Sequence, residues 1–390
     1  MRLPSPRTIP FALLLAVLFL SPSVLAADGV TESEIVLGQS CALEGPVRAL
    51  GLGMSTGLSA FFAAANRDGG VHGRAIRLIS RDDGYEPQQA IANTREFIRD
   101  EKVFCLIGEV GTPTSRAVVP LAEQEEVPFF APFTGAEFLR NPYKEYVVNL
   151  RASYYQEMER LAQYLVEEKG FSKIACFYQN DGYGQAGLAG IRRALERRDL
   201  ELVAGDNYER NTLAVKGAIL TIRRARPQAV VMVGAYQPCA EFIKQARRVG
   251  MDDVVYCNIS FVGTSALLKE LGEAGDGVII SQVVVFPWNR DVPVVAEYHE
   301  AMAAYGKSNP DADDRIGFVS LEGYLAGKLF FQVAEAAGKD LTREGFLEAV
   351  KSVGTYDLGG IEARFGPGDH QGLDEVFLTV IRDGKIQPLK

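Results

Sequence analysis

Short apolar runs alternate with longer amphipathic segments along most of this 390-residue chain. Runs that are apolar throughout are typical of strands buried on both faces of a parallel sheet, and the segments between them are typical of covering helices. In the first part of the chain this pattern predicts strands at 35–38, 76–80, 103–108 and 127–131. It predicts the intervening helices at 54–66, 87–100 and 113–126.

The same alternation begins again near Tyr155. It predicts helices at 156–170, 184–198, 215–226 and 238–249, and strands at 173–178, 202–204, 229–234 and 254–257. A chain of this length exceeds the usual size of one hydrophobic core. We therefore predict an α/β fold with two doubly wound, parallel-sheet lobes.

The last part of the chain adds a strand at 278–286, helices at 292–305 and 317–338, and a hairpin at 377–386. The hairpin prediction depends on the Asp383-Gly384 pair, which is typical of a tight turn between antiparallel strands. The pattern alone does not say which lobe receives these pieces.

The N-terminus has the features of an export signal. Arg2 and Arg7 precede an apolar run at 11–20, and Val24-Leu25-Ala26 fits a small-residue cleavage site. The run is too short to span a bilayer comfortably, and no cysteine follows it for lipid attachment. We expect cleavage after Ala26 and an exported mature chain that does not insert into the membrane.

Charge, cysteine and histidine content argue against several classes of partner and of bound group. The formal net charge is −9, and about −11 without the two signal arginines, which disfavours nucleic acids and anionic membrane surfaces as partners. The five cysteines have no CxxC spacing, and Cys105 and Cys176 lie in apolar runs typical of buried free thiols. Because the three histidines are far apart, we expect no metal and no cofactor.

The stretch at 66–87 predicts a helix that ends at glycines, reverses into a strand, and finishes in an acidic turn. Asp82-Asp83 in this turn suggests a metal site, but a solvated turn that caps the following helix is the favoured interpretation.

Gly108–Ser115 is the strongest candidate for a binding site. A strand ends at Gly108, and Thr112-Pro113 predicts an N-cap followed by the first helical turn. Free amides and the hydroxyls of Thr112, Thr114 and Ser115 would then face a cleft at the positive end of a helix, which suits a carboxylate. The alternative is an ordinary cap that serves only its own helix. No lysine follows the glycines, so this is not a phosphate-binding P-loop.

Three further segments follow predicted strands. Phe133, Thr134 and Gly135 repeat the geometry at the next strand end, where Phe133 packs either on a ligand or in the core. Tyr183 and Tyr236 follow strands in the second half, where each is either a wall of the cleft or a surface tyrosine.

The order and spacing of several motifs give a family resemblance that covers the whole mature chain. These motifs are Leu43-Glu-Gly-Pro46, the 66–87 stretch, Ile107–Ser115, Val127–Pro132, Leu150-Arg151, Asp181–Gly187, Val233–Tyr236 and Gln245–Gly250. Together they resemble the periplasmic leucine/isoleucine/valine-binding protein family, the substrate-binding proteins of ABC transporters with the type I periplasmic binding fold. The resemblance implies a periplasmic, non-enzymatic protein that binds a small molecule for a transporter permease. It also implies a three-crossover hinge, with 28–152 plus 287–360 in one lobe and 153–286 plus 361–390 in the other.

The resemblance also assigns residues. The carboxylate-binding hydroxyl falls on Thr112, a second hydroxyl or amide on Thr134 or Gly135, and pocket-wall aromatics on Tyr183 and Tyr236. Amino-acid binders of this family carry an acid near Ser260 or Phe261 that neutralises the ligand ammonium. Here no acid lies in 258–263, with Glu109 and Glu44 as possible substitutes. The family's bridging cysteines fall on Tyr85 and Gly111.

These departures suggest a ligand with an aromatic or apolar body and a carboxylate, bound by Thr112 with Arg48 as a charge partner. The hypothesis places six aromatic residues around the cleft: Phe133, Tyr154, Tyr183, Tyr236, Phe261 and Trp288. For a solute-binding protein, a branched-chain amino acid-like molecule is the alternative ligand. A ligand-sensing receptor for a signalling system is the alternative function. An enzyme is disfavoured because no Gly-x-Ser-x-Gly motif is present and the histidines lie outside the strand-end loops.

Overall fold

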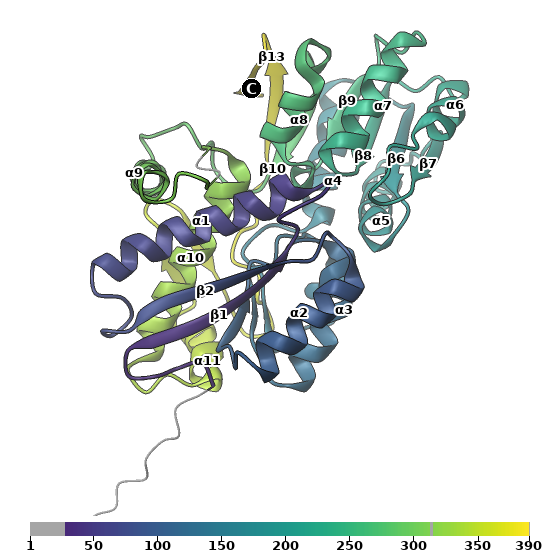
Figure 1. The fold of residues 1–390 in the computed structure, drawn as a ribbon. Helices are drawn as coiled ribbons and strands as arrows, with labels where there is room; N and C mark the ends of the chain where they lie inside the picture. Colours follow the sequence, from purple (N-terminus) through teal and green to yellow (C-terminus); the bar gives the residue numbers. More distant parts are fainter. Residues whose placement is uncertain (1–27, 313–314, 390) are drawn as a thin grey trace, which may run out of the picture.

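The computed structural model describes residues 28–312 and 315–389 and contains two α/β lobes, each built on its own mainly parallel sheet (Figure 1). The predicted fold class is confirmed. The expected export signal at 1–26 lies outside the described residues. Across the described residues no helix is both long and apolar enough to cross a membrane.

The first sheet has five parallel strands in the order β2-β1-β3-β4-β5. Strand β1 pairs with β2 along its whole length, from Glu34 opposite Ala75 to Cys41 opposite Asp82. The strands are β1 (Glu34–Cys41), β2 (Ala75–Asp82), β3 (Cys105–Ile107), β4 (Phe129–Phe130) and β5 (Val147–Val148).

The helices of the first lobe come from two distant parts of the chain. Those from its beginning are α1 (Arg48–Arg67), α2 (Pro87–Arg99) and α3 (Thr112–Gln124), and those from its end are α9 (Pro293–Ser308), α10 (Phe318–Ala337) and α11 (Arg343–Val353). Helix α10 is apolar over most of its length and packs along α1. The two backbones approach so closely that a Cβ at Gly57 would lie 2.0 Å from the carbonyl oxygen of Ser320.

The second sheet has seven strands in the order β14-β13-β10-β9-β8-β6-β7. They are β6 (Ile174–Gln179), β7 (Ala204–Tyr208), β8 (Ala229–Val233), β9 (Val255–Asn258), β10 (Ile279–Gln282), β13 (Phe377–Arg382) and β14 (Lys385–Pro388). The predicted C-terminal hairpin is confirmed: β13 and β14 pair around Asp383-Gly384, and β13 joins β10 antiparallel. The hairpin therefore completes the second sheet.

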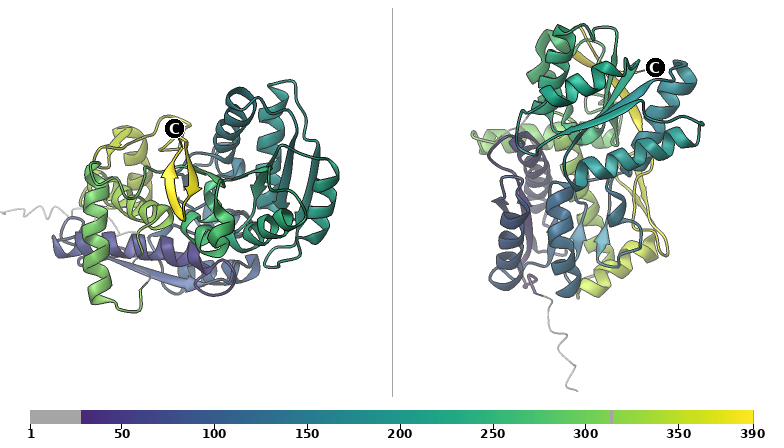
Figure 2. Two further views of the ribbon diagram at one scale, coloured as in Figure 1. Left: turned by 90° about the horizontal axis from the view of Figure 1, so that it is seen from above. Right: turned by 90° about the vertical axis from the view of Figure 1, so that its right-hand side faces the viewer.

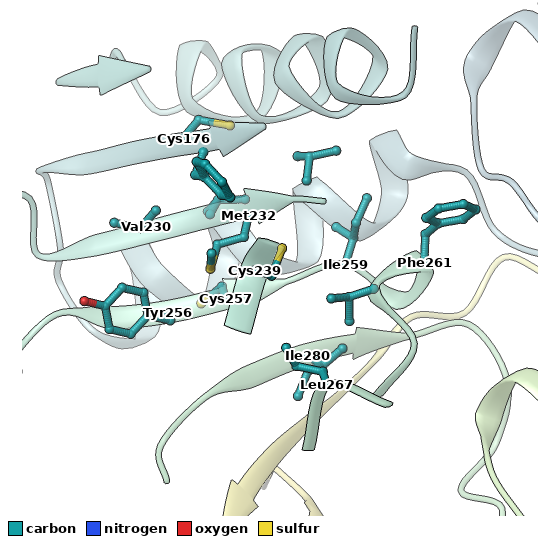
Figure 3. Close-up of a cluster of buried hydrophobic side chains, with 14 of the residues drawn as sticks. Cys176, Val230, Met232, Cys239, Tyr256, Cys257, Ile259, Phe261, Leu267 and Ile280 are labelled. Atoms are coloured by element: carbon teal, nitrogen blue, oxygen red, sulfur yellow. The ribbon is translucent and has the colours of Figure 1, made fainter. Parts of the chain in front are cut away.

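The helices of the second lobe are α4 (Tyr154–Ala162), α5 (Gly182–Glu196), α6 (Lys216–Arg224), α7 (Tyr236–Arg248) and α8 (Thr264–Leu271). The helix expected at 156–170 is divided, because a π-helical segment at Gln163–Glu168 follows α4. Short 3-10 turns lie at η1 (Glu137–Leu139), η3 (Ser260–Val262) and η4 (Gly272–Gly275). Figure 3 shows the core of this lobe around Met232 and Cys257, with Phe261 at its edge beyond the end of β9.

The chain passes between the two sheets three times: after β5, after β10, and after the small sheet formed by β11 (Thr355–Asp357) and β12 (Glu362–Arg364). Figure 2 shows the two lobes from above and from the side. Helix α4 packs on α5 and β10, so the second lobe begins directly after the first crossing. The exact residue boundaries of the lobes stay a prediction.

All five cysteines are buried free thiols, as predicted for Cys105 and Cys176. Burial raises the pKa of Cys176 to about 12 and raises the pKa of Cys105, Cys239 and Cys257 further. A buried thiol with a raised pKa holds almost no thiolate at neutral pH, so these cysteines are chemically unreactive in the folded chain.

Gly57→Ala tests the contact between α1 and α10. The added methyl group overlaps the Ser320 carbonyl, so we expect the free energy of unfolding to fall by about 1–3 kcal/mol, measured by urea denaturation. Gly217→Ala is the matched control, because an added Cβ there meets nothing within 4 Å and alanine is the better helix former. Equal effects of the two substitutions would contradict the close contact.

Candidate functional site

Five buried aromatic rings meet between the lobes, at the carboxyl ends of both sheets. Phe261 lies at the centre, with ring centroids 4.6 Å from Tyr183, 5.4 Å from Phe133 and 6.2 Å from Tyr85, while Tyr154 is 5.5 Å from Tyr183. Tyr85 and Phe133 come from the first lobe, and the other three come from the second. We call these five residues the aromatic cluster. Ligands of open α/β sheets bind at this edge of the strands.

Three hydroxyls lie beside the aromatic cluster. Thr112 Oγ1 is 2.7 Å from Thr134 Oγ1 and 3.5 Å from the hydroxyl of Tyr154, and Thr134 donates to the Tyr154 hydroxyl at 3.2 Å. A Cβ at Gly135 would lie 2.6 Å from Tyr154 Cδ1, so glycine lets this ring approach. The structure thus brings together Thr112, Thr134 and Gly135 as the sequence predicted, and each hydroxyl keeps lone pairs for a further partner.

The start of α3 differs from the prediction in two ways. Gly111, at a φ of 113°, is the N-cap, and Thr112 is already the first helical residue. The Thr114 hydroxyl donates to the Val110 and Gly111 carbonyl oxygens, and the Ser115 hydroxyl donates to Gly111, so these two groups serve their own helix. The protons of both hydroxyls are used within the helix, which fits the alternative of an ordinary cap that serves only its own helix.

Two of the six predicted cleft aromatics, Trp288 and Tyr236, lie outside the aromatic cluster. Trp288 is half-exposed and packs on Phe286 and Phe318, with ring centroids 5.0 and 5.8 Å away. Tyr236 lines a separate cavity of about 450 Å³ between the lobes, together with Arg48. The residues around this cavity lie at or just before the starts of α1, α7 and α10, and along α8. Arg48 is therefore placed at this cavity and not among the residues described beside Thr112.

Arg151, on the first crossing between lobes, forms a buried network that the sequence did not reveal. Its Nε donates to Glu322 Oε1 at 2.8 Å, and its Nη2 donates to Glu322 Oε2 at 3.0 Å and to Ser260 Oγ at 2.9 Å. Glu322 belongs to α10 of the first lobe, and Ser260 belongs to η3 of the second. The guanidinium carbon lies 4.3 Å from the centre of the Phe133 ring. Arg151 thereby ties both lobes to the aromatic cluster.

Glu157 of α4 fixes the other side of Ser260. Its carboxylate accepts hydrogen bonds from the Ser260 amide at 2.8 Å, the Ser260 hydroxyl at 3.0 Å and the Ser281 hydroxyl at 2.6 Å. Burial raises the pKa of Glu157 and of Glu322, and Arg151 opposes the shift in both. An acid thus does lie at Ser260, but it comes from a helix about a hundred residues earlier, and its oxygens are already paired.

Tyr85 occupies the place of one of the two cysteines that the family resemblance implies. It has a φ of 63°, and its ring lies over Gly111, where a Cβ would come within 2.3 Å of Tyr85 Cε2. Its hydroxyl accepts from Gln179 Nε2 at 3.3 Å. Tyr85 therefore packs against Gly111, the other position on which the family's cysteines fall, and extends to the second lobe, a contact that no local sequence pattern indicated.

The acidic turn at Asp82-Asp83 holds loops together. Asp82 accepts from the amides of Leu43 and Glu44, and Asp83 accepts from the Ser40 hydroxyl and the Tyr85 amide. Asp83 is almost fully buried, so the expected solvated turn capping α2 is wrong. In the part of the chain that the structure describes, no group of three or more histidine, cysteine or acidic residues is arranged to hold a metal ion.

Asp83 and Glu109 are buried carboxyls that interact electrostatically. Burial raises the pKa of Asp83 from 3.8 to about 6, against hydrogen bonds from Tyr85 and Ser40 that lower it. Burial, and then Asp83, raise the pKa of Glu109 well above its ordinary value. Neither carboxyl oxygen of Glu109 has a hydrogen-bond partner among the described residues. Burial and the neighbouring Asp83 therefore both favour the protonated form of Glu109.

Comparison with known proteins identifies the same architecture. A family model described as periplasmic binding protein matches residues 34–385. The structure of a possible leucine/isoleucine/valine-binding protein from Rhodopirellula baltica is 34% identical, with a TM-score of 0.85, over 94% of this chain and 98% of that one. A substrate-binding periplasmic protein from Ralstonia solanacearum is 28% identical, with a TM-score of 0.83, over 89% of this chain and 97% of that one.

A curated relative gives a more distant match. Leu/Ile/Val-binding protein homolog 7 of Brucella suis is 24% identical over 238 residues, which is 58% of this chain. The match spans 59% of the length of that relative.

The raised pKa of Asp83 predicts a pH dependence of stability. The folded chain holds this proton more tightly than the unfolded chain, so the stabilisation is complete below pH 3.8 and is lost as the pH rises through about 6. This pKa difference corresponds to about 3 kcal/mol. Asp83→Asn has no carboxyl that titrates at this position. The free energy of unfolding of wild type should therefore fall by about that amount relative to the variant between pH 4 and pH 7.

Urea denaturation at several pH values measures this difference. Asp253→Asn, at an exposed position, is the control and should follow the wild-type curve. Parallel curves for wild type and Asp83→Asn would show that Asp83 does not carry the effect.

Proposed function

The chain belongs to the periplasmic binding protein family, and on that basis we propose that it captures a small organic ligand between its lobes and delivers it to an ABC transporter. This is a family of solute-binding proteins, and we propose that this chain likewise performs no chemistry on its ligand. The observation that carries the proposal is the aromatic cluster with its three hydroxyls, built from both lobes at the strand ends.

The arrangement supports capture by closure of the two lobes. Phe133 and Tyr85 of the first lobe contact Phe261 of the second, so the walls of the site come together only when the lobes are closed. Three chain crossings form a hinge that permits such a motion. Closure strengthens polar contacts by excluding water, and it creates the composite surface that a transporter permease would recognise.

The ligand class is bounded by the walls of the site. The rings supply an apolar, aromatic surface, and the Thr112, Thr134 and Tyr154 hydroxyls supply polar contacts at one end. This chemistry fits an aromatic or apolar-bodied carboxylate, with a branched-chain amino acid-like molecule as the alternative. The proposed location is the periplasm, after cleavage of the signal at 1–26. That location fits the relatives named as periplasmic proteins.

A thermal-shift screen of the mature chain tests the proposal. The panel contains branched-chain and aromatic amino acids, their deaminated acids, and the matching amides. A true ligand at a hundred times its Kd adds about 2.7 kcal/mol of stability, which is a rise of several degrees in Tm. Phe261→Leu should reduce this rise, because the ring at the centre of the cluster is lost. Trp288→Phe should keep it.

Failure of every compound in the panel would count against small-molecule capture of this kind. Uptake of the identified ligand by the source cells then separates the two functions. Loss of uptake on deletion of the gene supports delivery to a transporter. Retained uptake with a lost cellular response to the ligand supports the sensing receptor instead.

A further inference from the structure

Two buried hydrogen-bond donors near the aromatic cluster have no partner. Arg151 Nη1 and the Tyr183 hydroxyl donate to no atom in the described part of the chain, although both side chains are at most 1% exposed. Buried donors are nearly always paired, because an unpaired one loses its hydrogen bonds to water without replacement. Two unpaired donors at one site therefore indicate acceptors supplied by another molecule.

The two donor side chains are linked through the rings of the aromatic cluster. The Arg151 guanidinium lies 4.3 Å from the centre of the Phe133 ring, Phe133 contacts Phe261 at 5.4 Å, and Phe261 contacts Tyr183 at 4.6 Å. The Arg151 fork is fixed by Glu322 and Ser260, so the direction of its free nitrogen is set in advance. Burial raises the pKa of Tyr183 well above its ordinary value, so its hydroxyl keeps its proton at physiological pH.

The carboxylates close to these donors already accept hydrogen bonds from other groups of the chain. Both oxygens of Glu322 accept from Arg151, and both oxygens of Glu157 accept from Ser260, with Ser281 as an additional donor. Among the described residues, neither Glu322 nor Glu157 therefore has an unpaired oxygen to offer a ligand ammonium. An unpaired buried charge is costly, so these two acids do not favour a cation at the cluster.

We propose that the ligand is an organic acid with an aromatic or branched apolar body and no α-ammonium group, and that Arg151 Nη1 and the Tyr183 hydroxyl donate to its carboxylate oxygens. This rests on the proposed function as a solute-binding protein. Arg151 then has two roles: it holds the lobes together through Glu322 and Ser260, and it selects the ligand through its remaining nitrogen.

Glu109 is the competing candidate for an ammonium partner, because its two carboxyl oxygens are also unpaired. Its surroundings oppose that role. Burial and the nearby Asp83 favour the protonated form, which has no charge to offer an ammonium. The competing possibility is tested directly by Glu109→Gln.

The experiment uses two pairs of compounds that differ only in the α-ammonium: 4-methylpentanoate against leucine, and 3-phenylpropionate against phenylalanine. Isothermal titration calorimetry of the mature wild-type chain should show binding of at least one acid. The corresponding amino acid should bind at least tenfold more weakly. Glu109→Gln should leave the affinity for that acid unchanged.

Tyr183→Phe is the decisive variant, because it removes a hydroxyl that has no partner among the residues that the structure describes. A purely structural role predicts no change in ligand affinity, whereas the proposal predicts a roughly 10- to 100-fold increase in Kd for the acid with Tm unchanged. Tyr256→Phe is the matched control with the opposite pattern. Its hydroxyl donates to the Met251 carbonyl away from the cluster, so it should lower Tm and leave Kd unchanged. Arg151→Lys should weaken binding of the acid by a similar factor.

Three results overturn the inference: an amino acid that binds as tightly as its acid, an unchanged Kd in Tyr183→Phe, or no binding of either acid. If the acids fail while other compounds of the thermal-shift panel bind, the solute-binding function stands and only the ligand assignment is lost. If the whole panel fails as well, the function is overturned together with the inference.

Discussion

Arg151 is a buried cation whose partners come from both lobes, and the geometry of the cleft depends on it. Glu322 connects it to α10, which packs along α1, and Ser260 connects it to the turn that carries Phe261. Glu157 then ties Ser260 to Ser281 in β10. Through the hydrogen bond of Ser260 to Arg151, which pairs with Glu322, these contacts connect η3 to the first lobe. The position of Phe261, and with it the aromatic cluster, follows from this network.

The sequence predicts the scaffold well, because strand and helix periods are local properties. The parallel strands, most helices and the Asp383-Gly384 hairpin follow from alternation and turn residues alone. Strand β7 is displaced from its predicted position because this edge strand is mostly polar and only partly buried. The helices α8 and α11 and the two-residue strand β5 were not predicted, since short elements give too few positions for a period.

The site is less predictable, because its contacts join residues far apart in the chain. Thr112 and Thr134 lie together, since the strands before them share one edge of the first sheet. The partners of Ser260 do not follow from its neighbours: Glu157 lies 103 residues earlier, and Arg151 lies 109 residues earlier. Tyr85 is a similar case, because only the structure shows that its ring covers Gly111, the other position on which the family's bridging cysteines fall. That loop is held by packing and hydrogen bonds, so its integrity does not depend on oxidation of any thiol.

The position of Trp288 gives the molecule an optical property of its own. It is the only tryptophan of the chain, and it follows β10 on the second crossing between lobes. Its indole packs on Phe286 and on Phe318, the first residue of α10, while 39% of the residue stays exposed to solvent. Indole emission responds to the polarity of its surroundings. A change in the path of this crossing therefore alters the fluorescence of a single residue, and the motion of the lobes can be followed in unlabelled protein with no background from other tryptophans.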